Sequence, residues 1–184
     1  MAPETPRIVA FVGSARPTRA HLLVEAVGGA LASGFGLEMT RHDLSDAGPG
    51  LPTLDRTALD PRSRGLVAAI EECDGLVVGM PVYQGSYPGL FKHVFDLIHP
   101  ATLRNKPVLL TAVGGGLRHS LMVEHQLRPL FGFFEAATVP TAVYACAEEI
   151  GPGTAPAGLL AARIANAAAQ FAALVPRPAV RINP

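Results

Sequence analysis

The sequence has few cysteines, no net charge and no long apolar run, and each absence argues against a class of protein. Cys73 and Cys146 stand far apart and form no CxxC pair, so we expect two reduced thiols rather than a disulfide or a metal site. Fifteen basic and fifteen acidic side chains cancel, which argues against nucleic acid or an anionic membrane as a partner. No segment approaches the roughly 20 apolar residues of a membrane span, and residues 1–7 carry no signal-like apolar stretch. We therefore expect a soluble, cytoplasmic protein, and its 184 residues, about half of them apolar, are near the usual size of one domain.

Short apolar runs alternate with segments of helical periodicity along the chain. Apolar runs predict buried strands at residues 8–12, 75–80 and 108–113, and the segments 37–44 and 138–145 are interpreted as two further strands. The periodic segments predict five helices, at residues 19–31, 61–73, 90–98, 120–134 and 155–174. Glycine and proline predict a loop at 45–55, and we expect loose ends at 1–6 and 176–184. This alternation predicts a doubly wound, parallel five-stranded α/β sheet, which binds ligands at the carboxyl ends of its strands.

The loop after the first predicted strand has the chemistry of a phosphate site. Ser14 and Thr18 supply hydroxyl donors, Arg16 or Arg19 can add positive charge, and Gly13 lets the backbone come close. The following helix start adds unpaired N–H groups. The loop has neither the Lys-Ser/Thr ending of a Walker motif nor a GxGxxG pattern, which argues against ATP hydrolysis and a dinucleotide site. The alternative is a helix N-cap with a solvated arginine.

Two further loops suit a flat heteroaromatic ring. In residues 81–89, Pro81 disfavours helix, Gly85 permits close approach, and Tyr83 or Tyr87 can stack on a ring. Three glycines at 114–116 leave no side chain between the backbone amides and a ligand. The alternatives are an ordinary proline-rich turn and a flexible connector.

Together the three loops resemble the NAD(P)H-dependent FMN reductases of flavodoxin-like fold, over residues 8–147. The resemblance rests on GSAR with Thr18, on PVYQGSYPGLFK at 81–92 and on AVGGGLRHSLMVEHQLRPLFGFF at 112–134. It extends in particular to the reductases that supply reduced flavin to alkanesulfonate and methanesulfonate monooxygenases. It implies a sheet of strand order 2-1-3-4-5 and a single FMN-binding reductase domain over residues 1–184.

The resemblance also implies roles for individual residues. It assigns the FMN phosphate to the first loop, at Ser14, Arg16, Thr18 and Arg19. It assigns the isoalloxazine ring to the other two, at Pro81, Val82, Tyr83, Gln84, Val113, Gly114 and Gly115. The sequence departs from the alkanesulfonate type at Ala20-His21, where serines are more usual, and at His125, where some relatives have tyrosine.

The implied chemistry is hydride transfer from NADPH or NADH to FMN, which the cofactors themselves carry out. No catalytic side chain is therefore expected, because the amides of Gly114 and Gly115 suffice to stabilise charge on the reduced ring. Arg118 either adds a cation to flavin or nicotinamide phosphates or is solvated. For His119 and His125 we expect capping or interface roles. No histidine has metal-site spacing, so no metal is assigned.

The predicted helix 120–134 carries more apolar side chains than one sheet face covers, which predicts a homodimer or homotetramer. On this reading, Phe131→Asp or Phe134→Asp breaks the oligomer, and Pro129 bends or loosens the helix.

Other functions remain open. They are a quinone, azo-dye or metal-ion reductase with bound FMN, a flavodoxin-type carrier, for which a neutral chain is unusual, and a non-catalytic phosphate-binding module.

Overall fold

The computed structural model describes residues 5–176, and a parallel sheet lies at its centre. The strands are β1 (Ile8–Val12), β2 (Met39–Asp43), β3 (Gly75–Pro81), β4 (Pro107–Gly114), β5 (Ala137–Thr138) and β6 (Val143–Cys146). They lie in the order β2-β1-β3-β4, with β5 and β6 both paired to β4. The parallel sheet is as predicted, whereas most of the expected loose ends lie outside the described residues.

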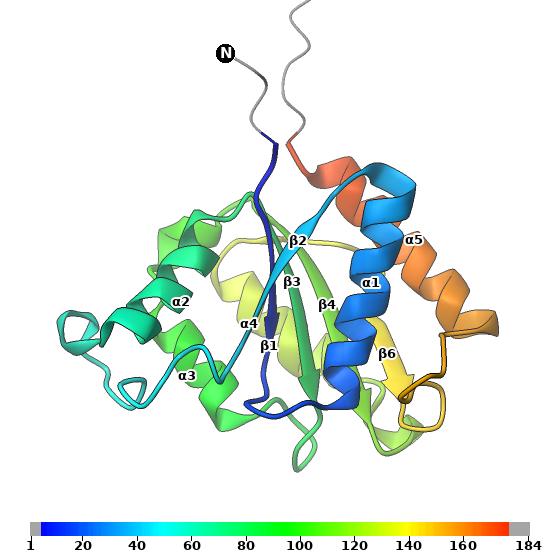
Figure 1. The fold of residues 1–184 in the computed structure, drawn as a ribbon, viewed down its shortest axis with the longest axis horizontal. Helices are drawn as coiled ribbons and strands as arrows, with labels where there is room; N and C mark the ends of the chain where they lie inside the picture. Colours follow the sequence, from blue (N-terminus) through cyan, green and yellow to red (C-terminus); the bar gives the residue numbers. More distant parts are fainter. Residues whose placement is uncertain (1–4, 177–184) are drawn as a thin grey trace, which may run out of the picture.

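Helices cover both faces of the sheet, as the doubly wound arrangement requires. They are α1 (Arg19–Phe35), α2 (Pro61–Glu72), α3 (Gly89–Leu97), α4 (Arg128–Phe133) and α5 (Gly158–Leu174). One face packs against α1 and α5, and the other against α2, α3 and α4 (Figure 1). Helix α1 continues one turn beyond the predicted end at Leu31, because Gly36 in the left-handed region (φ 66°) provides its C-cap.

The predicted fifth strand, residues 138–145, is two strands in the structure. Because β3 occupies one edge of β4, β5 and β6 share the other edge, β5 at the beginning of β4 and β6 at its end. Pro140 lies between them and has no N–H to donate to a neighbouring strand. The prediction of five strands is therefore wrong, because one position in the sheet is divided between two short strands.

The predicted helix 120–134 is irregular. A 3₁₀ turn, η3 (Leu117–His119), and a π-helix, η4 (Val123–Leu127), precede α4. Pro129 is the second residue of α4, which directly follows the π-helix, and it has no N–H to donate to the preceding turn. The guanidinium of Arg128 donates to Glu124 and to the carbonyls of Val139 and Pro140. Arg128 thus connects the π-helical segment Val123–Leu127 to the residues between β5 and β6.

Phe131 and Phe134 belong to the core of the single chain and not to its surface. Both are buried, and each ring packs against Phe95 of α3, with ring centroids 5.0 and 6.1 Å apart. The prediction that an aspartate at either position specifically breaks an oligomer is therefore wrong, because it would disrupt the fold itself. The exposed apolar side chains of this segment are Leu121 (62%) and Phe133 (68%).

Two further observations bear on the expectations from composition. Among residues 5–176, no helix is long and apolar enough to cross a bilayer. Cys73 and Cys146 are both buried and free, and burial raises the pKa of the Cys73 thiol to about 11.

Candidate functional site

The loops that follow β1, β3 and β4 lie together at the carboxyl edge of the sheet, the lower end in Figure 1. Two hydrogen bonds join them to neighbouring strands. The N–H of Gly13 donates to the carbonyl of Gly79 at 2.8 Å, and the N–H of Val82 donates to Val113 at 2.8 Å. The three predicted loops therefore share one edge of the molecule.

The first loop gathers hydrogen-bond donors at the start of α1. Ser14 is buried, and its hydroxyl donates to the carbonyl of Arg16 at 2.9 Å. Thr18 is the N-cap of α1, and the N–H groups of Arg19 and Ala20 in the first turn have no intrahelical acceptor. Both arginine side chains are exposed. Backbone donors, hydroxyls and two exposed arginines thus belong to one short segment, a composition that suits a phosphate ester.

Gly13 also has a packing role that the sequence analysis did not predict. A Cβ at this position would lie 2.9 Å from the ring of Phe91 in α3, which stacks on Phe11 at 5.6 Å. The glycine is therefore required for packing of α3 against the sheet, whether or not a phosphate approaches the backbone here.

The second loop is a tight hairpin. Tyr83 and Ser86 exchange backbone hydrogen bonds of 2.9 and 3.0 Å, and Gln84 and Gly85 between them both have positive φ, 50° and 83°. Tyr83 is half exposed at the edge, whereas Tyr87 packs against Phe91 in the core cluster. Of the two predicted stacking tyrosines, the structure leaves Tyr83 the more accessible. The left-handed conformation of Gln84, unusual for a residue with a side chain, holds the hairpin tip at this edge.

The third loop is held by a residue that the sequence analysis missed. Val113 and Gly114 are buried at the end of β4, and Gly115 is exposed. The hydroxyl of Tyr144 in β6 donates to the carbonyl of Gly116 at 2.6 Å. A Cβ on Gly114 would lie 2.1 Å from that hydroxyl, but one on Gly115 would have no atom within 4 Å. Gly114 thus makes room for the tyrosine that fixes the loop, and Gly115 presents bare backbone to the open edge.

The cationic and histidine side chains after the third loop are mostly exposed. Arg118 lies in η3, and its Nε donates to Nε2 of His119 at 3.1 Å. His125 is exposed on η4. Among the described residues, no cluster of three or more His, Cys, Asp or Glu side chains forms a potential metal site.

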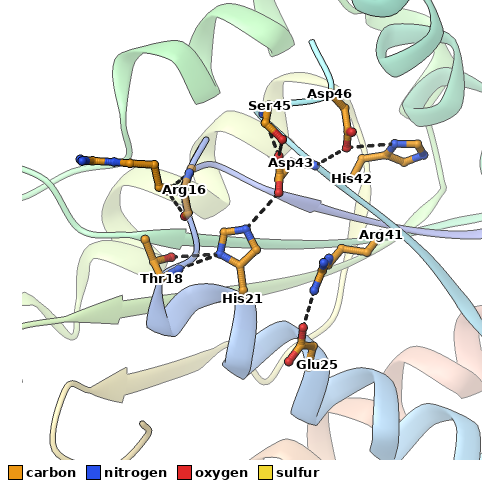
Figure 2. A network of polar contacts seen from close by, with 10 residues as sticks. Arg16, Thr18, His21, Glu25, Arg41, His42, Asp43, Ser45 and Asp46 are labelled. Carbon is orange, nitrogen blue, oxygen red and sulfur yellow. Dashed lines mark hydrogen bonds and ion pairs between the residues drawn. The ribbon is translucent and has the colours of Figure 1, made fainter. Parts of the chain in front are cut away.

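A polar network beside the first loop contains two residues that the predicted site lacks, His21 and Asp43 (Figure 2). His21, in the first turn of α1, lies between Thr18 and Asp43, the last residue of β2. The pKa of the Asp43 carboxyl is lowered from its usual value. Burial by itself would raise this pKa, but hydrogen bonds from the hydroxyl and N–H of Ser45 and the contact with His21 outweigh that effect. A cavity of about 580 Å³ opens here, lined in part by Thr18, Arg19, His21 and Asp43.

Comparison with known proteins gives a consistent result. Residues 6–150 match the family described as NADPH-dependent FMN reductase. The chain is 42% identical over 170 residues, 91% of either chain, to the NADH-dependent FMN reductase SfnF of Pseudomonas fluorescens. It is 45% identical over 134 residues, 72% of either chain, to the FMN reductase (NADPH) of Pseudomonas aeruginosa.

The fold is also found in solved structures. An oxidoreductase from Corynebacterium diphtheriae superposes with a TM-score of 0.76 at 32% identity, covering 94% of this chain and 98% of the other. The apo form of an NADH:FMN oxidoreductase superposes with a TM-score of 0.81 at 24% identity, covering 94% and 91%. A WrbA-like flavodoxin from Agrobacterium tumefaciens gives 0.65 at 19% identity, covering 92% and 97%, which supports a flavodoxin-like fold.

Proposed function

We propose that this chain, which belongs to the NADPH-dependent FMN reductase family, binds the FMN phosphate at the start of α1 and the isoalloxazine ring beside the loops after β3 and β4. The chain is an NAD(P)H-dependent FMN reductase. The observation that carries the placement is the donor set at residues 14–20, where hydroxyls, first-turn N–H groups and two exposed arginines meet at the carboxyl edge.

The residues at this edge fit FMN as a ligand. A phosphate dianion accepts hydrogen bonds only, and the first loop offers the Thr18 hydroxyl and the free N–H groups of Arg19 and Ala20. The Ser14 hydroxyl would add a further donor by turning from the Arg16 carbonyl to the phosphate. Gly115 leaves backbone uncovered where a polar ring edge would need it. Tyr83, half exposed on the hairpin, offers an aromatic face.

When bound, FMN supplies the redox chemistry by accepting a hydride from the nicotinamide. The chain's own residues bind and orient the ligands. Arg16 and Arg19 neutralise phosphate charge, and the amides of the glycine loop lie ready for a polar ring edge. Arg118, exposed beside that loop, would add a cation for a flavin or nicotinamide phosphate.

A comparison of FMN with riboflavin tests the phosphate site. A charge-assisted hydrogen bond contributes about 1.5–3 kcal/mol, so Arg16→Ala should weaken FMN about tenfold or more and leave riboflavin unchanged. Arg104→Ala, which removes a surface arginine paired with Glu135 at the opposite edge, is the matched control and should change neither affinity. Equal weakening of both flavins by Arg16→Ala in a fluorescence titration would place the phosphate elsewhere.

We further propose that reduced FMN leaves the enzyme and serves a partner monooxygenase of the sulfonate type. Its support is the similarity of the motifs at 81–92 and 112–134 to reductases of that kind. The test is to measure nicotinamide oxidation with and without added FMN and then with a quinone instead, using NADH and NADPH in parallel. In the absence of oxygen, which would otherwise reoxidise reduced FMN, oxidation of one nicotinamide for each free FMN added supports release. Rapid turnover with quinone on retained FMN would favour the quinone-reductase alternative.

We also propose that the chain is a homodimer or homotetramer that associates through the face covered by α3 and α4. Leu90, Leu117, Leu121 and Phe133 are more than half exposed, and all four come from these helices or the segment just before α4. Phe133→Asp should then lower the mass in sedimentation without unfolding. Leu159→Asp in α5 places the same charge on the opposite face and should leave the mass unchanged. Retention of the native mass by Phe133→Asp would exclude its ring from the contact.

A further inference from the structure

His21 is a buried imidazole whose two ring nitrogens both face partners. Its side chain is only 8% exposed, although the neighbouring loop is open to solvent. Nδ1 lies 3.1 Å from the backbone nitrogen of Thr18 and 3.2 Å from the Thr18 hydroxyl oxygen, and Nε2 lies 3.3 Å from Oδ2 of Asp43. Figure 2 shows the ring standing between the two residues. A buried polar ring with both nitrogens satisfied is a fixed element of the structure.

These contacts determine the protonation of the ring. A backbone N–H can only donate, so Nδ1 facing Thr18 must be the unprotonated acceptor. In the neutral ring the proton is then on Nε2, which donates it to the Asp43 carboxylate. Asp43 is itself held by the N–H of Ser45 at 2.7 Å. The end of β2 thus orients the imidazole, and the imidazole orients the start of α1.

The same geometry leaves the Thr18 hydroxyl free to donate a hydrogen bond to a ligand at the phosphate loop. Nδ1 has one lone pair, yet two Thr18 donors lie within reach, the backbone N–H and the hydroxyl. The N–H is fixed by the chain, whereas the hydroxyl proton can rotate to another acceptor without leaving Nδ1 unsatisfied. His21 therefore takes the role that glutamate or glutamine has in a capping box and leaves the Thr18 hydroxyl available.

We infer that His21, oriented by Asp43, is a positioning residue that presets the first turn of α1 for the phosphate of FMN. This inference rests on the proposed phosphate site. The neutral imidazole holds the Thr18 N–H and presents the Thr18 hydroxyl and the next two N–H groups to the phosphate. Nε2–H binds the Asp43 carboxylate on the far side of the ring, which fixes the orientation of the imidazole.

Binding measurements with three variants test this role. His21→Leu should weaken FMN about tenfold and leave riboflavin within twofold. His21→Asn, whose amide oxygen replaces Nδ1 as acceptor, should recover most of the FMN affinity. His42→Ala is the matched control, since it removes the adjacent histidine, which contacts Asp46 and not Thr18 in the same network, and it should leave both flavins unchanged. In turnover, His21→Leu should raise KM for FMN more than it lowers kcat.

A spectroscopic measurement keeps the inference testable if His21→Leu fails to fold. Nitrogen NMR of the wild-type protein should show His21 with a protonated Nε2 and an unprotonated Nδ1, before and after FMN binding. A proton on Nδ1 would overturn the inference, as would an unchanged FMN affinity in a folded His21→Leu. If Arg16→Ala also left FMN affinity unchanged, the phosphate site itself would be wrong. If Arg16→Ala weakened FMN and His21→Leu did not, only the role of His21 would fail.

Discussion

Two adjacent glycines in the loop after β4 should respond to substitution in opposite ways. A Cβ on Gly115 meets open space, and this backbone is not in the left-handed region, so Gly115→Val should fold normally. We expect its free energy of unfolding to stay within about 0.5 kcal/mol of the wild type, which is the usual range for surface changes. That is a shift of about 2 °C or less in Tm for a chain of this length.

The cost of Gly115→Val should appear in the reaction with flavin. A branched side chain would stand between the loop amides and a bound ring, and loss of one preorganised donor to developing charge costs about 2.7–4 kcal/mol, or roughly 100- to 1000-fold in rate. Stopped-flow reduction at saturating FMN measures this step. Gly29→Ala, which also enters open space but lies in α1, is the control. A Gly115→Val enzyme that reduces FMN at the wild-type rate would refute the placement of the ring at this loop.

Gly114→Ala should instead destabilise the fold. Its Cβ would lie 2.1 Å from the Tyr144 hydroxyl and 3.0 Å from Cζ, so the tyrosine must move and its bond to Gly116 is lost. Overpacking of this kind costs about 1–3 kcal/mol, and Tm should fall by about 2–4 °C for each kcal/mol. In the double variant Gly114→Ala with Tyr144→Phe, the hydroxyl oxygen that meets the new Cβ is gone, but the ring carbon Cζ still lies 3.0 Å from that Cβ. The double variant should therefore recover only part of the loss, and full additivity of the two single changes would mean that the tyrosine is not the obstacle.

Three further predictions follow from the structure. His119→Gln and His125→Gln should each leave hydride transfer within about tenfold, because a general acid or base contributes about 100-fold or more; a larger loss in stopped-flow reduction with FMN still bound would reveal a protonated side chain in the chemistry. The thiol of Cys73, with a pKa raised to about 11 by burial, should react with a disulfide reagent only after unfolding, and rapid labelling of the native protein would contradict this. The hydrogen bond from Arg128 lowers the pKa of the Glu124 carboxyl, so this ion pair stabilises the fold at neutral pH. The stabilisation is lost as the pH falls through that lowered pKa. Glu124→Gln should therefore lose less stability on acidification than the wild type, as measured by chemical denaturation.

The parts of the fold predicted correctly are those fixed by local pattern. β1, β3 and β4 are almost entirely apolar because helices cover both faces of the sheet. The strands are parallel, so the loops that follow them share one edge. Pro140 shows the limit of this argument. The run at 138–145 has the composition of one strand, and only its pairing with β4 shows that it is divided.

The error at Phe131 and Phe134 has a specific physical cause. The sequence analysis counted the apolar side chains of residues 120–134 and did not separate those that share one helical face from the rest. Val123, Leu127, Phe131 and Phe134 recur at helical spacing, and all four are buried. Phe131 and Phe134 pack against Phe95 of α3, whereas Phe133, between them in sequence, is exposed. The count of apolar residues alone does not show which of them face the core.

The residues that the sequence analysis missed at the site all act through tertiary contacts. Tyr144 reaches Gly116 from a neighbouring strand, and Asp43 reaches His21 across 22 residues of sequence. Asp43 was overlooked because β2 is an edge strand with a largely exposed, polar sequence, so it was not considered with the loops after β1, β3 and β4. Yet β2 ends at the same edge as β1, with which it pairs up to Val12 and Asp43. The departure from serine at position 21 was visible in the sequence, but its partner on β2 was not. The Asp43 carboxylate favours the tautomer in which Nδ1 accepts from Thr18, and it fixes the orientation of the ring. The first loop and β2 are therefore joined by contacts that the sequence of the loop alone does not show.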